Sequence, residues 1–247
     1  MITIQKQKIQ GLIINNTSYK EDSLKVTILT KNGLFDYIVK AGKRINSKLR
    51  PLAQELTFVE IVTTSNKTLN TLTEGVVLEN YTLIKENTNK LLSALAIIEY
   101  GKVFINSFND VEHVYNFILE MLNILKKTNY YHAGLLIFET KLLYAVGIGP
   151  NFSTCCKCGG NDAYYLDVTL GGAVCKNCLT NTSYNQEITK LFSLMYFIKL
   201  KNINEDFLQL IDNYSSILYQ ITKEYYATHF DYVNKNHDLL IEISKDN

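Results

Sequence analysis

Residues 8–78 alternate between short apolar runs and turn signals, with no sustained helical period. In one run Leu24, Val26 and Ile28 alternate with polar residues, as a half-buried antiparallel strand requires. The Asn32-Gly33 pair that follows is a common hairpin signal. The expected strands are residues 8–14, 24–30, 34–40, 56–63 and 72–78. Five short strands in about eighty residues predict a small closed barrel of OB type, because closure removes exposed sheet edges.

Beyond residue 81 the apolar residues recur at spacings of three and four, which predicts helices. Asn109 or Asp110 is the expected N-cap of the second helix, and Ser183 with Gln186 predicts a capping box. Glycines and a proline at 147–150 end the third helix. The expected helices are residues 91–98, 111–125, 131–146, 183–198 and 205–233.

Composition and charge narrow the class of protein. The 247 residues are 47% hydrophobic and include only 2 Pro and 12 Gly, which is typical of a globular protein rather than a disordered or low-complexity one. The net charge of +1 predicts no chain-wide attraction to nucleic acid or membrane. The N-terminus lacks the pattern of a secretory signal, and the longest apolar stretch, 91–98, is too short to cross a membrane. We expect a cytoplasmic protein, with no membrane partner.

All five cysteines fall within one short window. Cys155 and Cys158 form one CxxC pair, Cys175 and Cys178 form another, and 16 residues separate the two pairs. This spacing predicts a four-thiolate zinc site, because two CxxC turns can direct four sulfurs at one tetrahedral ion. Four protein ligands leave no open coordination position, so one structural zinc ion is expected.

Other uses of the cysteines fit less well. A thioredoxin-like redox site would have a single motif within a βαβ pattern, and a zinc deaminase would need an HxE element, which this chain lacks. Cys156 competes with Cys155 as a ligand, but it would form the less usual CxC geometry with Cys158. We therefore expect Cys156 to stand outside the metal site.

Positive charge gathers near the N-terminus. Residues 1–50 contain ten Lys and Arg against three Asp and Glu, a net charge of +7. The densest segment, residues 40–50, follows the third expected strand and contains both arginines of the chain. A loop of this kind can present cations and backbone amides to phosphates, although a solvated surface loop is the alternative. The candidate DNA-binding residues are Lys40, Lys43, Arg44, Lys48 and Arg50.

The order of these parts resembles RecO, the bacterial recombination-mediator family. The likeness covers nearly the full length and is carried by short segments in order. They are Gly11-Leu12-Ile13-Ile14, residues 19–24 and 29–33, the basic segment 40–50, residues 69–74, Gly147-Ile148-Gly149-Pro150-Asn151, and Gly171-Gly172-Ala173-Val174-Cys175 between the two CxxC pairs.

The resemblance implies an α+β architecture with an OB-fold domain at 1–80 and an all-α domain at 81–247, carrying a zinc-finger insert at about 152–182. It also implies a non-enzymatic role in DNA repair and recombination. Such proteins bind single- and double-stranded DNA, anneal complementary strands and, with RecR, help RecA replace single-stranded DNA-binding protein; nucleoid association would follow. The cations of segment 40–50 fall on the family's basic segment.

One departure concerns the C-terminal region, which is acidic and poor in lysine. Its acidic residues include Glu205, Asp206, Asp212, Glu224, Asp231 and Asp238. This charge puts a direct contact between DNA and the helical half in doubt. Two other functions stay open: a zinc-ribbon scaffold that binds protein partners in transcription or translation, and a hydrolase or deaminase that uses the metal. An enzyme would need an open metal position or a convergent acid-base group.

Overall fold

The computed structural model describes residues 6–65, 70–105 and 110–245. The chain divides into two compact units. One contains the described parts of 1–87 and 101–120, and the other contains those of 88–100 and 121–247. The division expected at residue 80 stays a prediction, because the helices around residue 100 contribute to both units.

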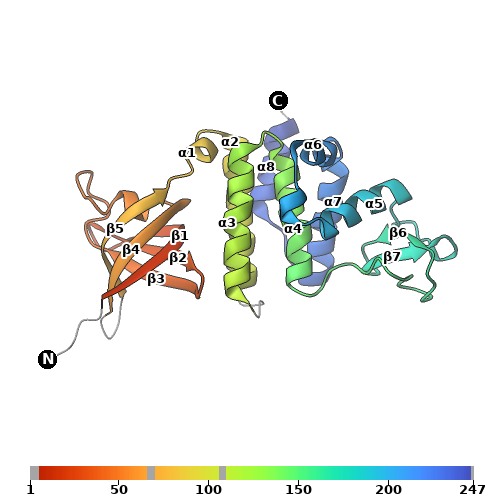
Figure 1. Ribbon diagram of the computed structural model, residues 1–247, viewed down its shortest axis with the longest axis horizontal. Coiled ribbons are helices and arrows are strands. Elements are labelled where there is room, and N and C mark those ends of the chain that lie inside the picture. The colour runs from red at the N-terminus through yellow and green to blue at the C-terminus, as the bar shows by residue number, and fades with distance from the viewer. Residues whose placement is uncertain (1–5, 66–69, 106–109, 246–247) are drawn as a thin grey trace. The chain divides into compact units, whose positions relative to one another are not determined.

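The first unit is built on a closed barrel with strand order β1-β2-β3-β5-β4 (Figure 1). Its strands are β1 (Lys6–Tyr19), β2 (Ser23–Thr30), β3 (Gly33–Val39), β4 (Thr57–Ser65) and β5 (Asn70–Glu79). Neighbours pair antiparallel except β3 and β5, which pair in parallel at three positions. The predicted five strands and OB-type barrel are confirmed, and the inward-facing Val26 and Ile28 lie in its core.

The long strand β1 closes the barrel by pairing with two neighbours. Its first part pairs with β4 and its second part with β2, and the register shifts between Ile13 and Asn15. A bulge of this kind bends a strand. At Gly11 an added Cβ would lie 2.4 Å from a side-chain carbon of Ile28, so only glycine lets the two strands approach this closely.

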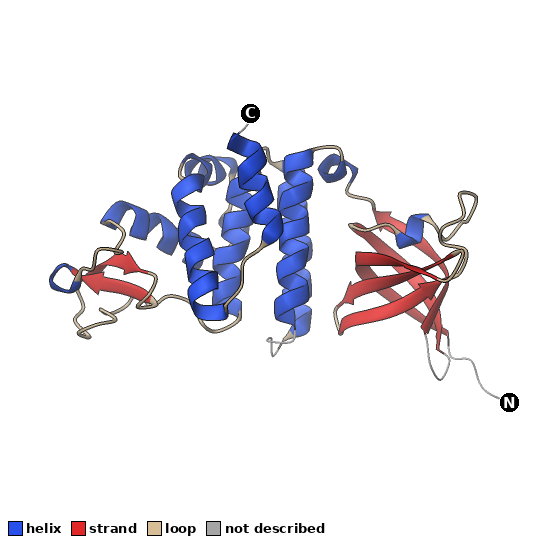
Figure 2. Ribbon diagram, turned by 180° about the vertical axis from the view of Figure 1, so that it is seen from behind, coloured by secondary structure: helices blue, strands red, loops and turns tan. Residues whose placement is uncertain are grey.

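Helices form most of the second unit, with one small hairpin inserted (Figure 2). The hairpin consists of β6 (Ala163–Asp167) and β7 (Gly172–Cys175). The helices of the chain are α1 (Thr82–Lys85), α2 (Thr88–Phe104), α3 (Val111–Lys127), α4 (Tyr131–Ala145), α5 (Gln186–Phe197), α6 (Glu205–Asn213), α7 (Ser215–Phe230) and α8 (Lys235–Lys245). Short 3-10 turns lie at Pro51–Ala53, Lys176–Cys178 and Leu200–Asn202.

Helix α4 is the centre of the second unit. Nearly all of its residues from His132 to Leu143 are buried, since α5, α6 and α7 all pack against it. A helix that is apolar on all sides suits such a position. The Tyr226 hydroxyl on α7 donates a hydrogen bond to the Glu139 carbonyl oxygen at 2.8 Å, which joins two of these helices through a buried polar contact.

Two details of the predicted helices are wrong. The stretch 205–233 is broken at Tyr214, whose backbone leaves the helical region, and the second piece ends at Phe230 because Asp231 adopts φ of 51°. Helix α5 is capped by Asn185, which accepts a hydrogen bond from the Ile188 amide. Ser183 therefore does not form the expected capping box.

The N-cap expected before the second long helix can be assigned in part. Asp110 Oδ1 accepts a hydrogen bond from the His113 amide at 2.9 Å, as an N-cap side chain does. Asn109, the other candidate, lies outside the described residues. Across the described ranges, none of the helices combines the length and apolar character needed to cross a membrane.

His132 predicts a pH dependence of stability. Burial, with a smaller effect of His237, lowers its pKa to about 4, against about 6.5 in an unfolded chain. Between these values the unfolded state binds a proton that the folded state does not. The free energy of unfolding should therefore fall by roughly 3 kcal/mol as pH drops from 6.5 to 4 and then level off. Urea unfolding at several pH values measures this effect.

The contribution of His132 is isolated by comparing variants. His132→Asn should remove this part of the pH dependence, because no group at this position then titrates. His113→Asn is the matched control, since His113 is exposed. Identical pH dependence in wild type and His132→Asn would refute the assignment.

Candidate metal centre and nucleic-acid interface

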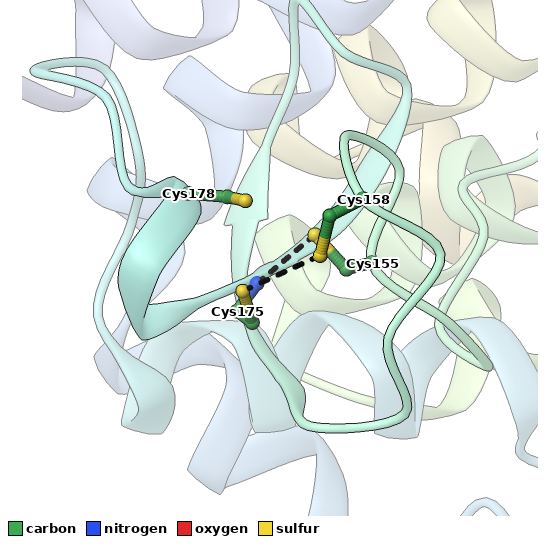
Figure 3. Close-up of side chains that lie close together, drawn as sticks. All are labelled: Cys155, Cys158, Cys175 and Cys178. Atoms are coloured by element: carbon green, nitrogen blue, oxygen red, sulfur yellow. Dashed lines mark hydrogen bonds between the residues drawn. The ribbon is translucent and has the colours of Figure 1, made fainter.

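The four cysteines of the two CxxC pairs converge on one point. Their sulfurs all lie within 4.8 Å of one another, and Figure 3 shows the four side chains directed at a common centre. The Sγ atoms of Cys158 and Cys175 are 3.8 Å apart. A tetrahedral ion with metal–sulfur distances of about 2.3 Å would place its ligands about 3.8 Å apart. The donor set and its geometry therefore fit a tetrahedral metal ion.

Backbone turns hold the first pair of cysteines. The Cys155 amide donates to the Gly160 carbonyl oxygen at 2.7 Å, and the Gly159 amide donates back to the Cys155 carbonyl oxygen at 2.8 Å. Gly159 has φ of 75°, a left-handed conformation that favours glycine. The turn closes so that Cys155 and Cys158 both face the centre.

The second pair begins where β7 ends. Cys175 is the last residue of β7, and Cys178 lies one 3-10 turn later. The Cys175 amide donates to Cys155 Sγ at 3.3 Å, which links the two pairs. Strand β6 lies between the two CxxC pairs in the chain, and its pairing with β7 brings the distant cysteines together.

Cys156 lies outside the cluster, as predicted. Its amide donates to the Ala173 carbonyl oxygen at 2.9 Å, which adds this segment beside β7 and directs its side chain away from the four ligands. An added Cβ on Gly172 would lie 2.8 Å from Cys156 Sγ, so the thiol packs against the hairpin backbone. Burial raises the pKa of Cys156, and the nearby Cys155 adds to this effect.

Electrostatics in the cluster favour a cation. Burial opposes the Cys155 thiolate, but amides of Cys175, Cys158 and Lys157 stabilise it and lower its pKa to about 6. The pKa of Cys178 is raised to about 12, first by its hydrogen bond with Cys175 and then by burial. The Cys178 thiolate would therefore be stabilised by the positive charge of a metal ion held between the four sulfurs.

Asp167 fastens the hairpin to the start of α5. This buried carboxylate accepts hydrogen bonds from the hydroxyls of Thr180 at 2.5 Å and Ser183 at 3.1 Å, and from the Leu170 amide at 3.0 Å. Burial alone would raise the pKa of Asp167, but these donors hold it below its usual value. Ser183 is engaged here, which explains why Asn185 caps α5 instead.

The five predicted DNA-binding residues lie on residues 40–50, here called the basic loop. Successive turns order it: the Gly42 amide donates to Val39, the Arg44 amide to Ala41 and the Arg50 amide to Ser47, at 3.1–3.2 Å. The amides of Gly42, Arg44 and Arg50 are engaged by these turns, whereas contact of the loop's other amides with phosphates stays a prediction. The cationic side chains are the other groups that the loop can present.

The cations of the basic loop fall into two sets. Lys43 Nζ donates to the carbonyl oxygens of Lys20 at 2.9 Å and Glu21 at 3.2 Å. Arg44 donates through Nε and Nη2 to Asp22 Oδ2, at 2.9 and 2.5 Å. Both cations therefore contact residues 20–22, here called the docking turn. Among the described residues, no hydrogen bond or ion pair engages the exposed side chains of the remaining three, which are Lys40, Lys48 and Arg50.

The docking turn is a part of this surface that the sequence reasoning missed. Tyr19 pairs with Ser23, and Leu24 pairs with Val39, so the docking turn and Lys40 lie at the same end of the barrel. Lys20 is exposed, and its Nζ lies 5.5 Å from the centre of the Tyr19 ring. The sequence did contain a signal for this surface, because Lys20 lies in the short segment between the first two expected strands.

A closed OB-type barrel followed by a helical unit with a four-cysteine cluster is the architecture of a DNA repair and recombination protein. Residues 1–81 match the family model described as Recombination protein O N terminal, and residues 85–236 match Recombination protein O C terminal. The chain therefore belongs to the RecO family of DNA repair proteins.

Individual relatives agree with the family assignment. A DNA repair protein RecO of Caldicellulosiruptor bescii is 26% identical over 203 residues, which are 80% of this chain and 83% of the relative. Another, of Alkaliphilus metalliredigens, is 25% identical over 244 residues, covering 96% of this chain and 98% of the relative. The aligned range thus includes the barrel, the helices and the four-cysteine cluster.

Proposed function

We propose that this chain is a non-enzymatic recombination mediator, which binds DNA through the barrel surface that carries the basic loop. The ordered presentation of unpaired cations at one end of an OB-type barrel is the observation that supports this most strongly. Lys40, Lys43, Arg44, Lys48 and Arg50 are the proposed DNA-binding residues.

The proposed mechanism is electrostatic. Lysine and arginine side chains neutralise phosphates and release their counterions, so the repulsion between two complementary strands falls when protein coats one of them. Annealing then proceeds by base pairing alone, without base readout and without hydrolysis of a nucleotide. The sequence contains no GxxxxGK[ST] phosphate loop, in agreement with this mechanism.

The family supports more specific partners. We propose that the chain acts with RecR to help RecA load onto DNA covered by single-stranded DNA-binding protein. We also propose that the four cysteines bind one Zn²⁺, because four thiolates in tetrahedral geometry are a common structural zinc site. The residues that would hold it are Cys155, Cys158, Cys175 and Cys178, and its role is to stabilise the hairpin.

Salt dependence of DNA binding tests the proposal. If about five cations contact the phosphates of a single strand, log K against log salt should have a slope of roughly −3.5. Fluorescence anisotropy of a labelled oligonucleotide across a salt series measures the slope. No binding even at low salt would contradict the mediator function and would favour a scaffold that binds protein partners.

Variants locate the binding surface. Replacing Lys40, Lys48 and Arg50 together with glutamine should reduce the slope by about 2, because about 0.7 is lost per single-strand phosphate contact. The matched control replaces Lys31, Lys127 and Lys235 with glutamine, which removes the same charge at exposed positions outside the basic loop. Equal effects of the two triple variants would contradict a localised site.

A further inference from the structure

The basic loop is attached to the barrel through the docking turn. Besides the side-chain contacts of Lys43 and Arg44, the Lys43 amide donates to the Asp22 carbonyl oxygen at 3.1 Å. Beyond these contacts, Leu49 packs against the barrel core. The loop therefore meets the barrel at one polar and one apolar contact, and the polar contact uses two of its five cations.

We propose that Asp22, Lys43 and Arg44 position the basic loop, and that Lys20 joins Lys40, Lys48 and Arg50 in contacting the phosphates of single-stranded DNA. This inference rests on the proposed function, and it divides the cations by role. Lys43 and Arg44 act on DNA mainly through the geometry that they give to the loop, so four phosphate contacts replace the five assumed above and the expected salt slope becomes roughly −2.8.

The contacts of Arg44 suit a positioning role. Two of its donors meet one carboxylate oxygen of Asp22, so the guanidinium is oriented as well as neutralised. Lys43 Nζ reaches two backbone carbonyl oxygens, which bear no net charge that could be exchanged for a phosphate. A phosphate would have to share Lys43 and Arg44 with these protein partners, whereas Lys40, Lys48 and Arg50 offer all their donors.

Lys20 belongs to the phosphate-contacting set by position. It is exposed, it adopts φ of 53° at the tip of the docking turn, and its own carbonyl oxygen accepts from Lys43. The turn that receives the basic loop thus carries a cation of its own beside the loop. The half-buried ring of Tyr19 lies next to it, so an aromatic face accompanies the charge.

The sign of the change in DNA affinity caused by Asp22→Asn distinguishes a positioning role of Asp22 from a purely electrostatic one. The substitution removes a negative charge from a DNA-binding surface, so electrostatics alone predicts tighter binding. If Asp22 positions the loop, affinity for a labelled single-stranded oligonucleotide should instead fall about two- to fivefold, the range of an exposed ion pair. Anisotropy titration at fixed salt decides between the two signs.

A double-mutant cycle shows whether Arg44 acts through Asp22. Arg44→Gln should weaken binding by a similar factor, and the double variant should bind no more weakly than either single variant. Arg44→Lys keeps the charge but not the two-donor contact, so it should not restore wild-type affinity. Hydrogen exchange of the loop amides should rise in both single variants without DNA, which reports the loosened loop directly.

The salt slope tests Lys20. Lys20→Gln should make the slope less steep by about 0.7, as expected for the loss of one single-strand contact, whereas Arg44→Gln should change affinity more than slope. Asp36→Asn is the charge-matched control for Asp22, since Asp36 lies within β3 and pairs with Lys25 at 2.8 Å. It should not weaken binding.

Each part of the proposal is contradicted by a different experimental result. Tighter binding by Asp22→Asn, or a full Arg44→Gln effect that persists in the Asp22→Asn background, would overturn the positioning role. An unchanged slope in Lys20→Gln would overturn its phosphate contact. Salt-independent or absent binding by the wild-type protein would instead overturn the proposed function itself. Circular dichroism of each variant should match wild type, so that loss of fold is distinguished from loss of contact.

Discussion

Replacing Cys175 with serine is expected to abolish metal binding at the proposed site and to loosen the hairpin that contains it. A serine hydroxyl is a poor replacement for a thiolate, and the remaining three sulfurs would leave the ion open to water and to competing chelators. The buried residues of the cluster around the site are the small Cys155, Ala163, Ala173 and Val174, with Phe152 and Tyr165 only partly buried against them, so the apolar core that can hold the hairpin without the ion is small.

The expected loss of metal and of hairpin stability in Cys175→Ser is large, because metal binding is coupled to folding at such sites. Structural zinc contributes about 10–16 kcal/mol of apparent binding free energy in zinc-finger peptides. Metal content measured after gel filtration should fall from about one ion per chain, the number for a single four-thiolate site, to nearly none. Limited proteolysis should then cut within residues 152–182, which the wild-type protein protects.

Cys156→Ser is the matched control. It removes a thiol one residue from a ligand, but this thiol stands outside the cluster of four sulfurs. Metal content and protease resistance should stay at the wild-type level. The ligand assignment fails if Cys175→Ser retains its metal, or if Cys156→Ser loses it.

Replacing Glu139 with alanine will lower the free energy of unfolding by about 1–3 kcal/mol, the cost of leaving the buried His237 ring without its hydrogen-bond partner. Glu139 on α4 and His237 on α8 lie 2.6 Å apart, and their side chains are 0% and 2% exposed. The surroundings of Glu139 and His237 are strongly desolvated. One consequence is that burial, with the added effect of Glu139, raises the pKa of Tyr100 well above its ordinary value. Urea unfolding measures the loss.

Two comparisons identify the cause. The double variant Glu139→Met with His237→Leu should recover much of the lost stability, because apolar residues of similar size leave no unpaired polar group. The partly exposed pair of Lys223 and Asp238, also 2.6 Å apart, is the control on neighbouring helices. Lys223→Ala should cost no more than about 1 kcal/mol. Equal losses at the two pairs would show that burial is not the cause.

Much of the fold follows from local pattern. Alternation of apolar and polar residues identified the five strands, and the change to a spacing of three and four marked where the helices begin. The predicted ends of the strands were less accurate. The first strand was expected to end at residue 14, but β1 extends to Tyr19, because it pairs first with β4 and then with β2. The break at Tyr214 also escaped prediction, since the apolar spacing continues across it.

The sequence predicted the four-cysteine cluster more completely than the basic loop. The four cysteines whose sulfurs converge were identified from the sequence, without Cys156, because a CxxC turn determines locally which two sulfurs can face one ion. The roles within the basic loop could not be identified, because they depend on Asp22, which is about twenty residues away in the chain. Neither composition nor spacing relates that carboxylate to Arg44.

The sequence by itself determined which segments form strands and helices, which four sulfurs belong together and where positive charge gathers. These properties depend on neighbours along the chain, through side-chain alternation, capping and turn geometry. Only the tertiary structure decided which cations are engaged by carbonyls and carboxylates, and that Glu139 meets His237 inside the helical unit. Such pairings depend on how barrel closure and helix packing bring distant residues together, and that information is not local.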